Sequence, residues 1–129
     1  LNEGIQIAQR GSLTIDEPVI AGGPAAYFST LPLKAMLAAL HDAGLPAGIS
    51  HSAGTYVCNH IAYAMLHLAA KQRGMRAGFI HIPYLPAQAA RLRGEPSMAQ
   101  AEVERGLLIA LRAATTTLVD DRFSGGSLD

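Results

Sequence analysis

The spacing of apolar residues predicts three helices. Apolar side chains recur every three or four positions in residues 32–43, 55–71 and 97–119, which gathers them on one face of a helix. Gly44 and Gly74 are the expected ends of the first two helices. The positions that define the three apolar faces are Leu33, Met36, Leu37 and Leu40; Val57, Ile61, Met65 and Leu68; and Val103, Leu107, Leu111 and Leu118.

Side chains that can cap a helix precede two of these segments. Ser29 or Thr30 is the expected cap of the first helix. Ser97 with Gln100 has the Ser-x-x-Gln form of a capping box at the start of the third. A capping side chain accepts a hydrogen bond from a first-turn amide that the helix leaves without a partner. We therefore expect these residues to set the two helix starts.

Short apolar runs alternate with the helices and predict strands. Residues 47–50 and 76–80 read as buried strands, and a shorter strand is expected at 18–21. The order helix, strand, helix, strand, helix is typical of an α/β protein, whose apolar strands lie parallel and are covered on both faces. Two such strands are too few for a sheet, so we expect an N-terminal part of the domain to supply the rest.

Composition narrows the classes of partner. The 129-residue chain is half apolar and carries ten basic and ten acidic side chains, as in an ordinary globular domain. With zero net charge and no basic stripe, there is no electrostatic reason to expect nucleic acid or an anionic membrane. The longest apolar stretch, residues 61–70, is too short to cross a bilayer and contains Tyr63 and His67. We therefore expect no nucleic-acid partner, no membrane insertion and no secretory signal.

Cys58 is the only cysteine, so it is expected to be a free thiol, which suits a reducing cytoplasm. It falls in the first turn of the second predicted helix, after a strand and a turn at Gly54. The partial positive charge of a helix N-terminus favours the thiolate, the nucleophilic form, and such junctions carry nucleophiles in α/β hydrolases. A lone cysteine in an amphipathic helix is also often a small buried filler, and its position alone leaves both interpretations open.

His81 is the histidine that topology favours as a base for this thiol. It closes the predicted strand that follows the Cys58 helix. Parallel strands place their carboxyl ends at one edge of a sheet, where open α/β sheets have their sites, so Cys58 and His81 should meet there. A strand-end histidine bonded to a loop would occupy the same place in the sequence, and spacing alone does not separate the two.

The other four histidines have simpler explanations. His41 closes a helix, where positive charge is favourable, and His51 precedes a turn and is expected to face solvent. His60 and His67 are seven positions apart on one helix face, a spacing that could hold a metal ion, but no third ligand accompanies them. We therefore expect no metal site.

Three blocks of sequence resemble one enzyme family. They are GPAAYFSTLP at 23–32, SAGTYVCN at 52–59 and FIHIPYLP at 79–86. In this order they are similar to pyroglutamyl-peptidase I, also called pyrrolidone-carboxylate peptidase, over nearly the whole chain. The resemblance implies an α/β fold, a three-layer sandwich with a mostly parallel central sheet. Residues 1–129 would be the C-terminal part of this single peptidase domain.

The resemblance also implies a reaction and its residues. The family removes N-terminal pyroglutamate from peptides with a Cys–His–Glu triad and no cofactor, so Cys58 would be the nucleophile and His81 the base. Tyr56 and Val57 match positions that line the pocket for the pyrrolidone ring, although many members have Phe where this chain has Tyr56. The triad glutamate matches a position before Leu1, so the activity of this chain alone is an open question.

The sequence therefore predicts a cysteine-type omega-peptidase whose partners are peptides with an N-terminal pyroglutamate. Two alternatives stay open. One is a related cysteine amidohydrolase with another pocket, which a substrate panel would distinguish. The other is a truncated, inactive α/β domain that serves as an interaction surface. Because family members commonly self-associate, the resemblance also implies a homo-oligomer.

Overall fold

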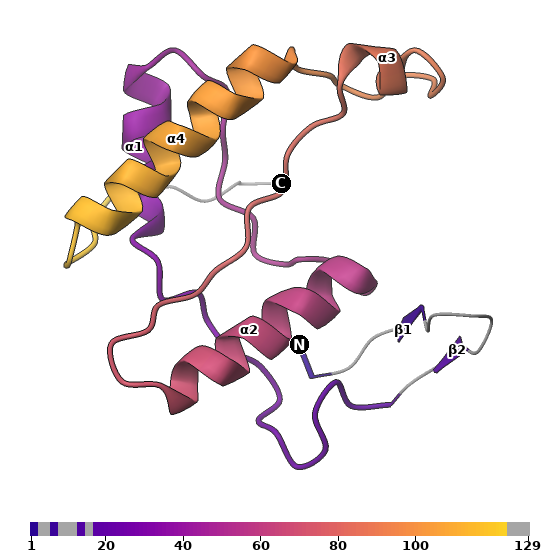
Figure 1. Cartoon of the computed structure of the whole chain (residues 1–129), viewed down its shortest axis with the longest axis vertical. Helices are drawn as coiled ribbons and strands as arrows, with labels where there is room; N and C mark the ends of the chain where they lie inside the picture. Colours follow the sequence, from indigo (N-terminus) through magenta and orange to yellow (C-terminus); the bar gives the residue numbers. More distant parts are fainter. Residues whose placement is uncertain (3–5, 8–12, 15–16, 124–129) are drawn as a thin grey trace. The chain divides into compact units, whose positions relative to one another are not determined.

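The computed structural model describes residues 1–2, 6–7, 13–14 and 17–123. Two short strands pair antiparallel near the N-terminus, with Gln6 opposite Thr14 and Ile7 opposite Leu13. Helices account for most of the regular structure in the described part of the chain (Figure 1). The elements in chain order are β1 (Gln6–Ile7), β2 (Leu13–Thr14), α1 (Leu33–Asp42), α2 (Val57–Lys71), α3 (Pro86–Ala89) and α4 (Gln100–Thr116).

The three predicted helices are confirmed as α1, α2 and α4, and glycine ends the first two as expected. Gly44 has φ of 73° and Gly74 has φ of 80°, a left-handed conformation that favours glycine. The Gly44 amide donates to the His41 carbonyl at 2.8 Å, and the Leu45 amide donates to the Leu40 carbonyl at 2.9 Å. These bonds use carbonyls that the last turn of α1 leaves without helical partners.

The three predicted strands are wrong for the described residues. Residues 18–21 form a bend and a turn, closed by a hydrogen bond from the Gly23 amide to the Ile20 carbonyl at 3.0 Å. Residues 76–80 form no named strand either, and in residues 47–50 only Ile49 takes part in an isolated β-bridge. An apolar run becomes a strand only through a ladder of hydrogen bonds to neighbouring strands, and the sequence pattern does not supply that neighbour.

Both predicted caps are also wrong. The capping position of α1 is Pro32 and that of α4 is Ala99, and neither helix start has a side-chain cap from that position. Ser97 instead forms a parallel bridge with Tyr84, and the Gln100 side chain donates to Glu104 at 2.7 Å. Local sequence allowed each cap, but α1 and α4 begin one or more residues after the expected capping residues.

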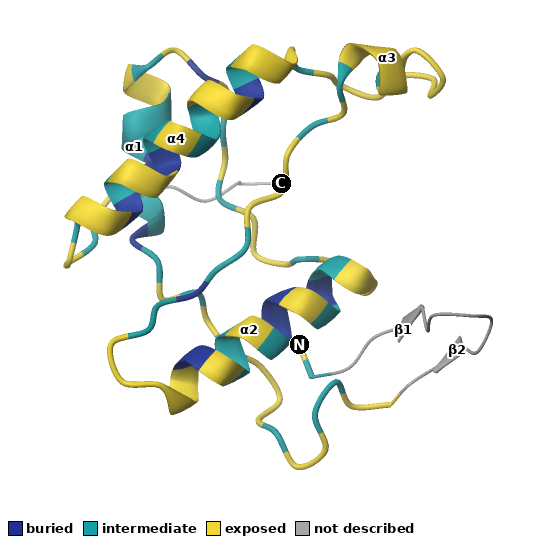
Figure 2. Ribbon diagram, in the orientation of Figure 1, coloured by how far each residue is buried: buried dark blue, intermediate teal, exposed yellow. Residues whose placement is uncertain are grey.

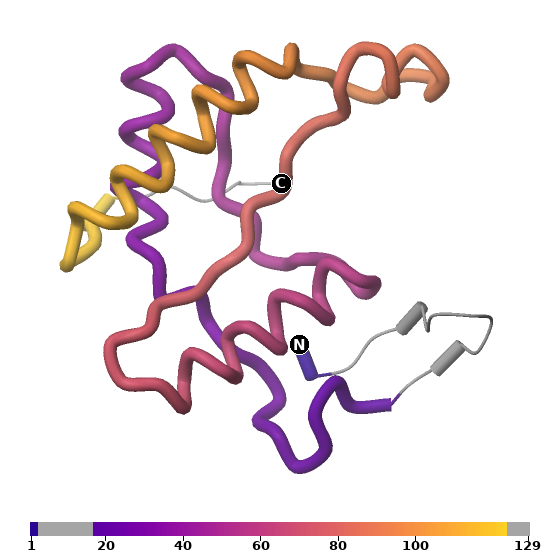
Figure 3. The backbone as a smooth tube through the Cα atoms, viewed as in Figure 1, coloured from indigo at the N-terminus to yellow at the C-terminus, as the bar shows by residue number. Residues whose placement is uncertain are grey.

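The described chain divides into two compact units. The first comprises Leu1–Leu31 and Ser50–Phe79, and the second comprises Pro32–Ile49 and Ile80–Asp129. The chain therefore passes between the units three times. In the second unit α1 packs along α4, and the two helices lie side by side in Figures 1 and 3. The buried apolar side chains of this unit are Met36, Leu37, Leu45, Val103, Ala110 and Ala114.

Small residues allow the close approach of α1 and α4. Ala110 and Ala114 are buried on α4, whereas the predicted core residue Leu111 is 54% exposed and Leu118 lies beyond the end of the helix (Figure 2). A Cβ added at Gly106 would lie 3.3 Å from a Leu45 methyl group. The predicted face of the third helix is therefore correct at Val103 and wrong toward its C-terminal end.

Helix α2 shows the largest departure from the sequence pattern. Its predicted apolar face is exposed, at 44% for Val57, 49% for Ile61 and 41% for both Met65 and Leu68. The buried residues lie on the opposite face, which packs within the first unit (Figure 2): Asn59, Ala62, Tyr63 and Ala69. Periodicity defines the faces of a helix, but only the neighbouring segments decide which face they cover. Among the described residues no helix is long and apolar enough to cross a membrane.

Candidate active site

Cys58 is the second residue of α2, and its thiol is free and partly buried. Tyr56 occupies the capping position, with φ of −110° and ψ of −151°, and its own side chain makes no capping hydrogen bond. The first-turn amides of a helix have no carbonyl partner within the helix itself. Such amides carry the positive end of the helix dipole, which favours an anion at the position of Cys58.

The turn before α2 is built by three hydroxyl contacts that sequence reasoning missed. The Ser50 hydroxyl donates to the Ser52 carbonyl at 2.8 Å and accepts the Ser52 amide at 3.3 Å. The Ser52 hydroxyl accepts the Gly54 amide at 3.0 Å. Gly54 has φ of 81°, a left-handed conformation in which another residue would be strained. The serine spacing was the available signal, since serine hydroxyls often bond backbone two residues away.

Asn59, next to the thiol, was also missed. It is only 3% exposed, and its side-chain amide donates to the Leu1 carbonyl at 3.0 Å while its oxygen accepts from the Leu1 nitrogen at 2.8 Å. A buried amide is costly unless its donor and acceptor are both paired, and here both are. Asn59 therefore holds the first turn of α2 against Leu1.

The buried anchor of α2 is Tyr63, which is 1% exposed and donates from its hydroxyl to the Pro24 carbonyl at 2.7 Å. Burial raises the pKa of Tyr63 above 10.0, with a smaller contribution from the neighbouring Tyr27. Tyr27 lies 5.1 Å from Tyr63 between ring centres and bonds His67 Nδ1 through its hydroxyl at 2.8 Å. This aromatic cluster attaches residues 24–27 to the helix that carries Cys58.

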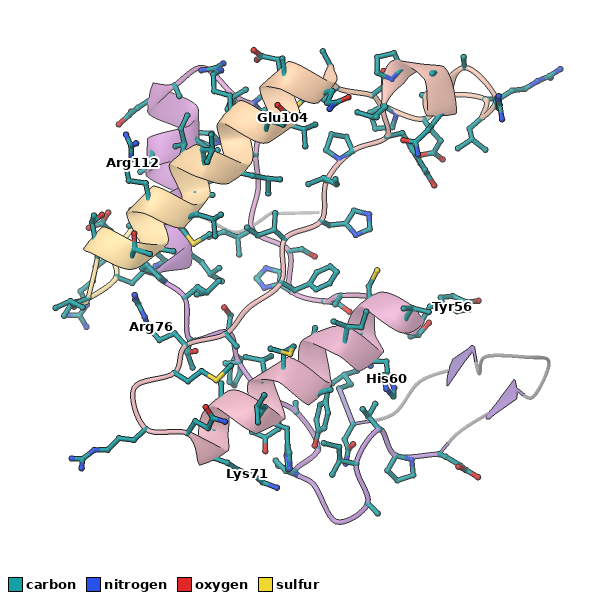
Figure 4. The ribbon with its side chains drawn as sticks, in the orientation of Figure 1. Tyr56, His60, Lys71, Arg76, Glu104 and Arg112 are labelled. Atoms are coloured by element: carbon teal, nitrogen blue, oxygen red, sulfur yellow. The ribbon has the colours of Figure 1, made fainter. Side chains whose placement is uncertain are left out.

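The residues predicted to bind substrate lie beside Cys58. Tyr56 is 56% exposed and Val57 is 44% exposed, so both present apolar surface at the start of α2 (Figure 4). His60, one turn further along, has a buried Nδ1 with no hydrogen-bond partner among the described residues. The structure therefore brings together Tyr56, Val57 and Cys58 through local helix geometry.

His81 belongs to the second unit, two residues after Phe79, and its side chain is exposed. Cys58 belongs to the first unit. The pairing of these two side chains therefore stays a prediction.

Two other histidines have structural partners. His41 Nε2 donates to the Ala47 carbonyl at 2.9 Å, and His67 bonds Tyr27, so His67 is engaged in the aromatic cluster rather than open to a ligand. His51 is exposed, as predicted. Among the described residues no group of three histidine, cysteine or acidic side chains is placed to hold a metal ion.

The chain matches a family of known proteins. The sequence pattern of the family described as pyroglutamyl peptidase matches residues 5–117. The chain is 52% identical over 118 residues to the pyrrolidone-carboxylate peptidase of Klebsiella pneumoniae (strain 342), covering 92% of this chain and 55% of that protein. It is 48% identical over 129 residues to the pyrrolidone-carboxylate peptidase of Pectobacterium atrosepticum, covering 99% and 60%.

Solved structures agree with the sequence relatives. The crystal structure of pyroglutamyl peptidase I from Bacillus amyloliquefaciens matches with a TM-score of 0.88 at 32% identity, covering 96% of this chain and 60% of that one. Pyrrolidone carboxyl peptidase from Pyrococcus furiosus matches with a TM-score of 0.80 at 38% identity, covering 92% and 61%. These similarities define an α/β protein of the peptidase class.

The chain belongs to the pyroglutamyl peptidase family. It spans only about half the length of the curated relatives that it matches. The chain covers 54% of the length of one relative and 60% of the length of another.

Proposed function

We propose that Cys58 and His81 are the nucleophile and base of an enzyme that releases N-terminal pyroglutamate from peptides. The observation that carries the proposal is the position of the only thiol, in the first turn of helix α2, in a chain of this peptidase family. The supporting fold is a three-layer α/β sandwich with a mostly parallel sheet, to which residues 1–129 contribute the C-terminal part.

The proposed reaction has two steps. His81 takes the proton of the Cys58 thiol, the thiolate attacks the pyroglutamyl carbonyl carbon, and the resulting oxyanion is stabilised by first-turn amides of α2. As the C–N bond breaks, the leaving amine takes a proton from His81, and an acyl-enzyme remains. His81 then accepts a proton from water, the hydroxide attacks the acyl carbon, and the C–S bond breaks to release pyroglutamate and the thiolate.

The surroundings of Cys58 suit a neutral substrate group. Pyroglutamate is a lactam without a free amino group, so a charged side chain would gain no ion pair with it. Tyr56 and Val57 present exposed apolar surface beside Cys58, and an apolar slot with a few amide-directed hydrogen bonds recognises such a ring. We propose these two side chains as walls of the substrate pocket.

We further propose that the protein is a cytoplasmic homo-oligomer. The free Cys58 thiol suits a reducing compartment, and the family resemblance supports self-association. Light scattering at high protein concentration is the test of assembly. A monomer at every concentration would contradict the proposal.

The activity test compares this chain with a chimera that adds the part of the Klebsiella pneumoniae relative that the chain does not span. The substrate is a fluorogenic pyroglutamyl amide, with the matching prolyl amide as comparator. We expect turnover of the pyroglutamyl amide by the chimera. The variants Cys58→Ser and His81→Gln should lower kcat by several powers of ten, because each removes one member of a nucleophile–base pair.

His41→Gln is the matched control, because glutamine can still donate to the Ala47 carbonyl. It should leave kcat unchanged within about twofold, as expected for a surface substitution away from the chemistry. Equal turnover of the prolyl amide would support a related amidohydrolase with another pocket instead. A folded chimera that hydrolyses neither substrate would refute the proposed function.

A further inference from the structure

Two segments of the first unit, residues 29–31 and 77–78, are joined by a compact set of hydrogen bonds. The Thr30 amide donates to the Ala77 carbonyl at 2.9 Å, and the Ala77 amide donates to Thr30 Oγ1 at 2.8 Å. Thr30 Oγ1 in turn donates to the Ala77 carbonyl at 3.2 Å. Ser29 Oγ also reaches this carbonyl, at 3.3 Å. We call these contacts the Thr30–Ala77 clasp, and both backbone groups of Ala77 take part in it.

The segments also pack closely beside the clasp (Figure 3). A Cβ added at Gly78 would lie 2.6 Å from both a Leu31 methyl group and Ser29 Oγ, closer than real Cβ contacts. Ala77 itself is buried. One backbone hydrogen bond, the hydroxyl contacts and close packing therefore act together at one point, although neither segment belongs to a named strand.

The clasp lies next to two of the three places where the chain passes between the units. Thr30 is two residues before Pro32, and Ala77 is three residues before Ile80, where the second unit resumes. His81 follows Ala77 by only four residues. The Thr30 side chain therefore bonds the backbone of Ala77, four residues before His81.

We propose that Thr30 is a positioning residue for His81. The inference rests on the proposed function for its catalytic meaning. A base must reach within about 3 Å of the proton that it accepts, and a misplacement of about 1 Å by a distant change can cost about 100-fold in rate. When the Thr30 hydroxyl is removed, the Ala77 amide loses its acceptor. The backbone at Ala77, four residues before His81, is then less restrained.

Three variants isolate the hydroxyl. Thr30→Val removes Oγ1 but keeps the branched shape and the backbone amide. Thr30→Ser restores a hydroxyl. Thr115→Val is the matched control, because Thr115 Oγ1 also donates to a backbone carbonyl, that of Arg112 at 2.9 Å, but lies on the exposed surface of α4.

The first measurement is NMR of the 129-residue chain. In Thr30→Val we expect faster exchange of the Ala77 amide and line broadening of the His81 ring signals, with both restored in Thr30→Ser and unchanged in Thr115→Val. This readout needs no turnover, so it stands apart from the proposed function. If the Ala77 amide of Thr30→Val exchanged freely while the His81 signals stayed unchanged, the proposal would be overturned.

The second measurement is steady-state hydrolysis of the pyroglutamyl amide by the chimera. Thr30→Val should lower kcat about tenfold or more and leave KM within about twofold, since a displaced base affects the chemical step rather than ground-state binding. Thr30→Ser should recover most of kcat. A folded Thr30→Val variant with the kcat of the wild type would overturn the positioning role. An inactive wild-type chimera would refute the proposed function. In that case the NMR result alone would decide whether Thr30 positions His81.

Discussion

Asp120 supplies the cap that the first turn of α1 lacks in its own sequence. Its two carboxylate oxygens accept from the Lys34 amide at 3.1 Å and the Ala35 amide at 3.0 Å, across 86 and 85 positions of sequence. Pro32, at the capping position, has no side-chain acceptor. The interaction therefore connects the chain after α4 to the start of α1 within the second unit.

We predict that Asp120→Ala destabilises the protein by about 1–2 kcal/mol. A lost N-terminal cap typically costs about 1 kcal/mol, and the lost charge at the helix N-terminus adds about 0.3–1 kcal/mol. Urea unfolding followed by circular dichroism at pH 7 measures this difference. The control is Asp121→Ala, because the exposed side chain of Asp121 accepts no cap hydrogen bond from α1.

The pH dependence gives a second, independent check. Burial works to raise the pKa of Asp120, but hydrogen bonds from the Ala35, Lys34 and Asp121 amides and the Lys34 charge outweigh it, so the pKa is lowered below 3.8. A carboxylate whose pKa is lowered by folding stabilises the protein above its unfolded-state pKa. This stabilisation is lost as the pH falls through the folded-state pKa.

The difference in unfolding free energy between wild type and Asp120→Asn should therefore be constant from about pH 5 to 7 and shrink below about pH 4. The amide that replaces the carboxylate cannot titrate, and it offers only one acceptor oxygen for two backbone donors. An Asp120→Ala variant within about 0.3 kcal/mol of wild type, well below the usual cost of a lost cap, would refute the reasoning. A difference that grows at low pH would refute it equally.

Three further predictions concern packing. Gly78→Ala should lower the unfolding free energy of the protein by about 1–3 kcal/mol through overpacking. Gly48→Ala is the control and should have no such effect, because an added Cβ there meets nothing within 4 Å. Equal urea midpoints for the two variants would contradict the close packing at Gly78. Tyr63→Phe should cost about 1 kcal/mol, because the Pro24 carbonyl loses its buried donor; a neutral result in thermal unfolding would show that water replaces it. Ile61→Lys should change the unfolding free energy by less than about 0.5 kcal/mol, since the side chain is exposed, and a loss above about 2 kcal/mol would show that this face of α2 is covered in solution.

Local sequence was sufficient for features that depend on neighbours in the chain. The apolar spacing predicted α1, α2 and α4, and glycines with positive φ end the first two. The position of Cys58 in the first turn of α2 followed from the same pattern and from Gly54 before it. These features are local because helix hydrogen bonds join residues only four apart.

Tertiary structure decided which surfaces and side chains the helices use. Periodicity placed Ile61 on an apolar face, but residues 24–27 bind the other face of α2 through Tyr63, so the predicted face is exposed. The cap of α1 comes from Asp120, far along the chain, and not from Thr30, which bonds Ala77 instead. Each outcome depends on a partner that local spacing does not specify.

The candidate site shows the same division. The three motif blocks were enough to predict the family, and the sequence relatives confirm it. Asn59 was missed because its partner, the Leu1 backbone, is 58 positions away, whereas the spacing of Ser50 and Ser52 was a local signal that the apolar pattern did not use. The sequence by itself determined the helices, their turns and the family. Only the folded chain decided which buried donors meet which acceptors, because that choice depends on segments brought together in space.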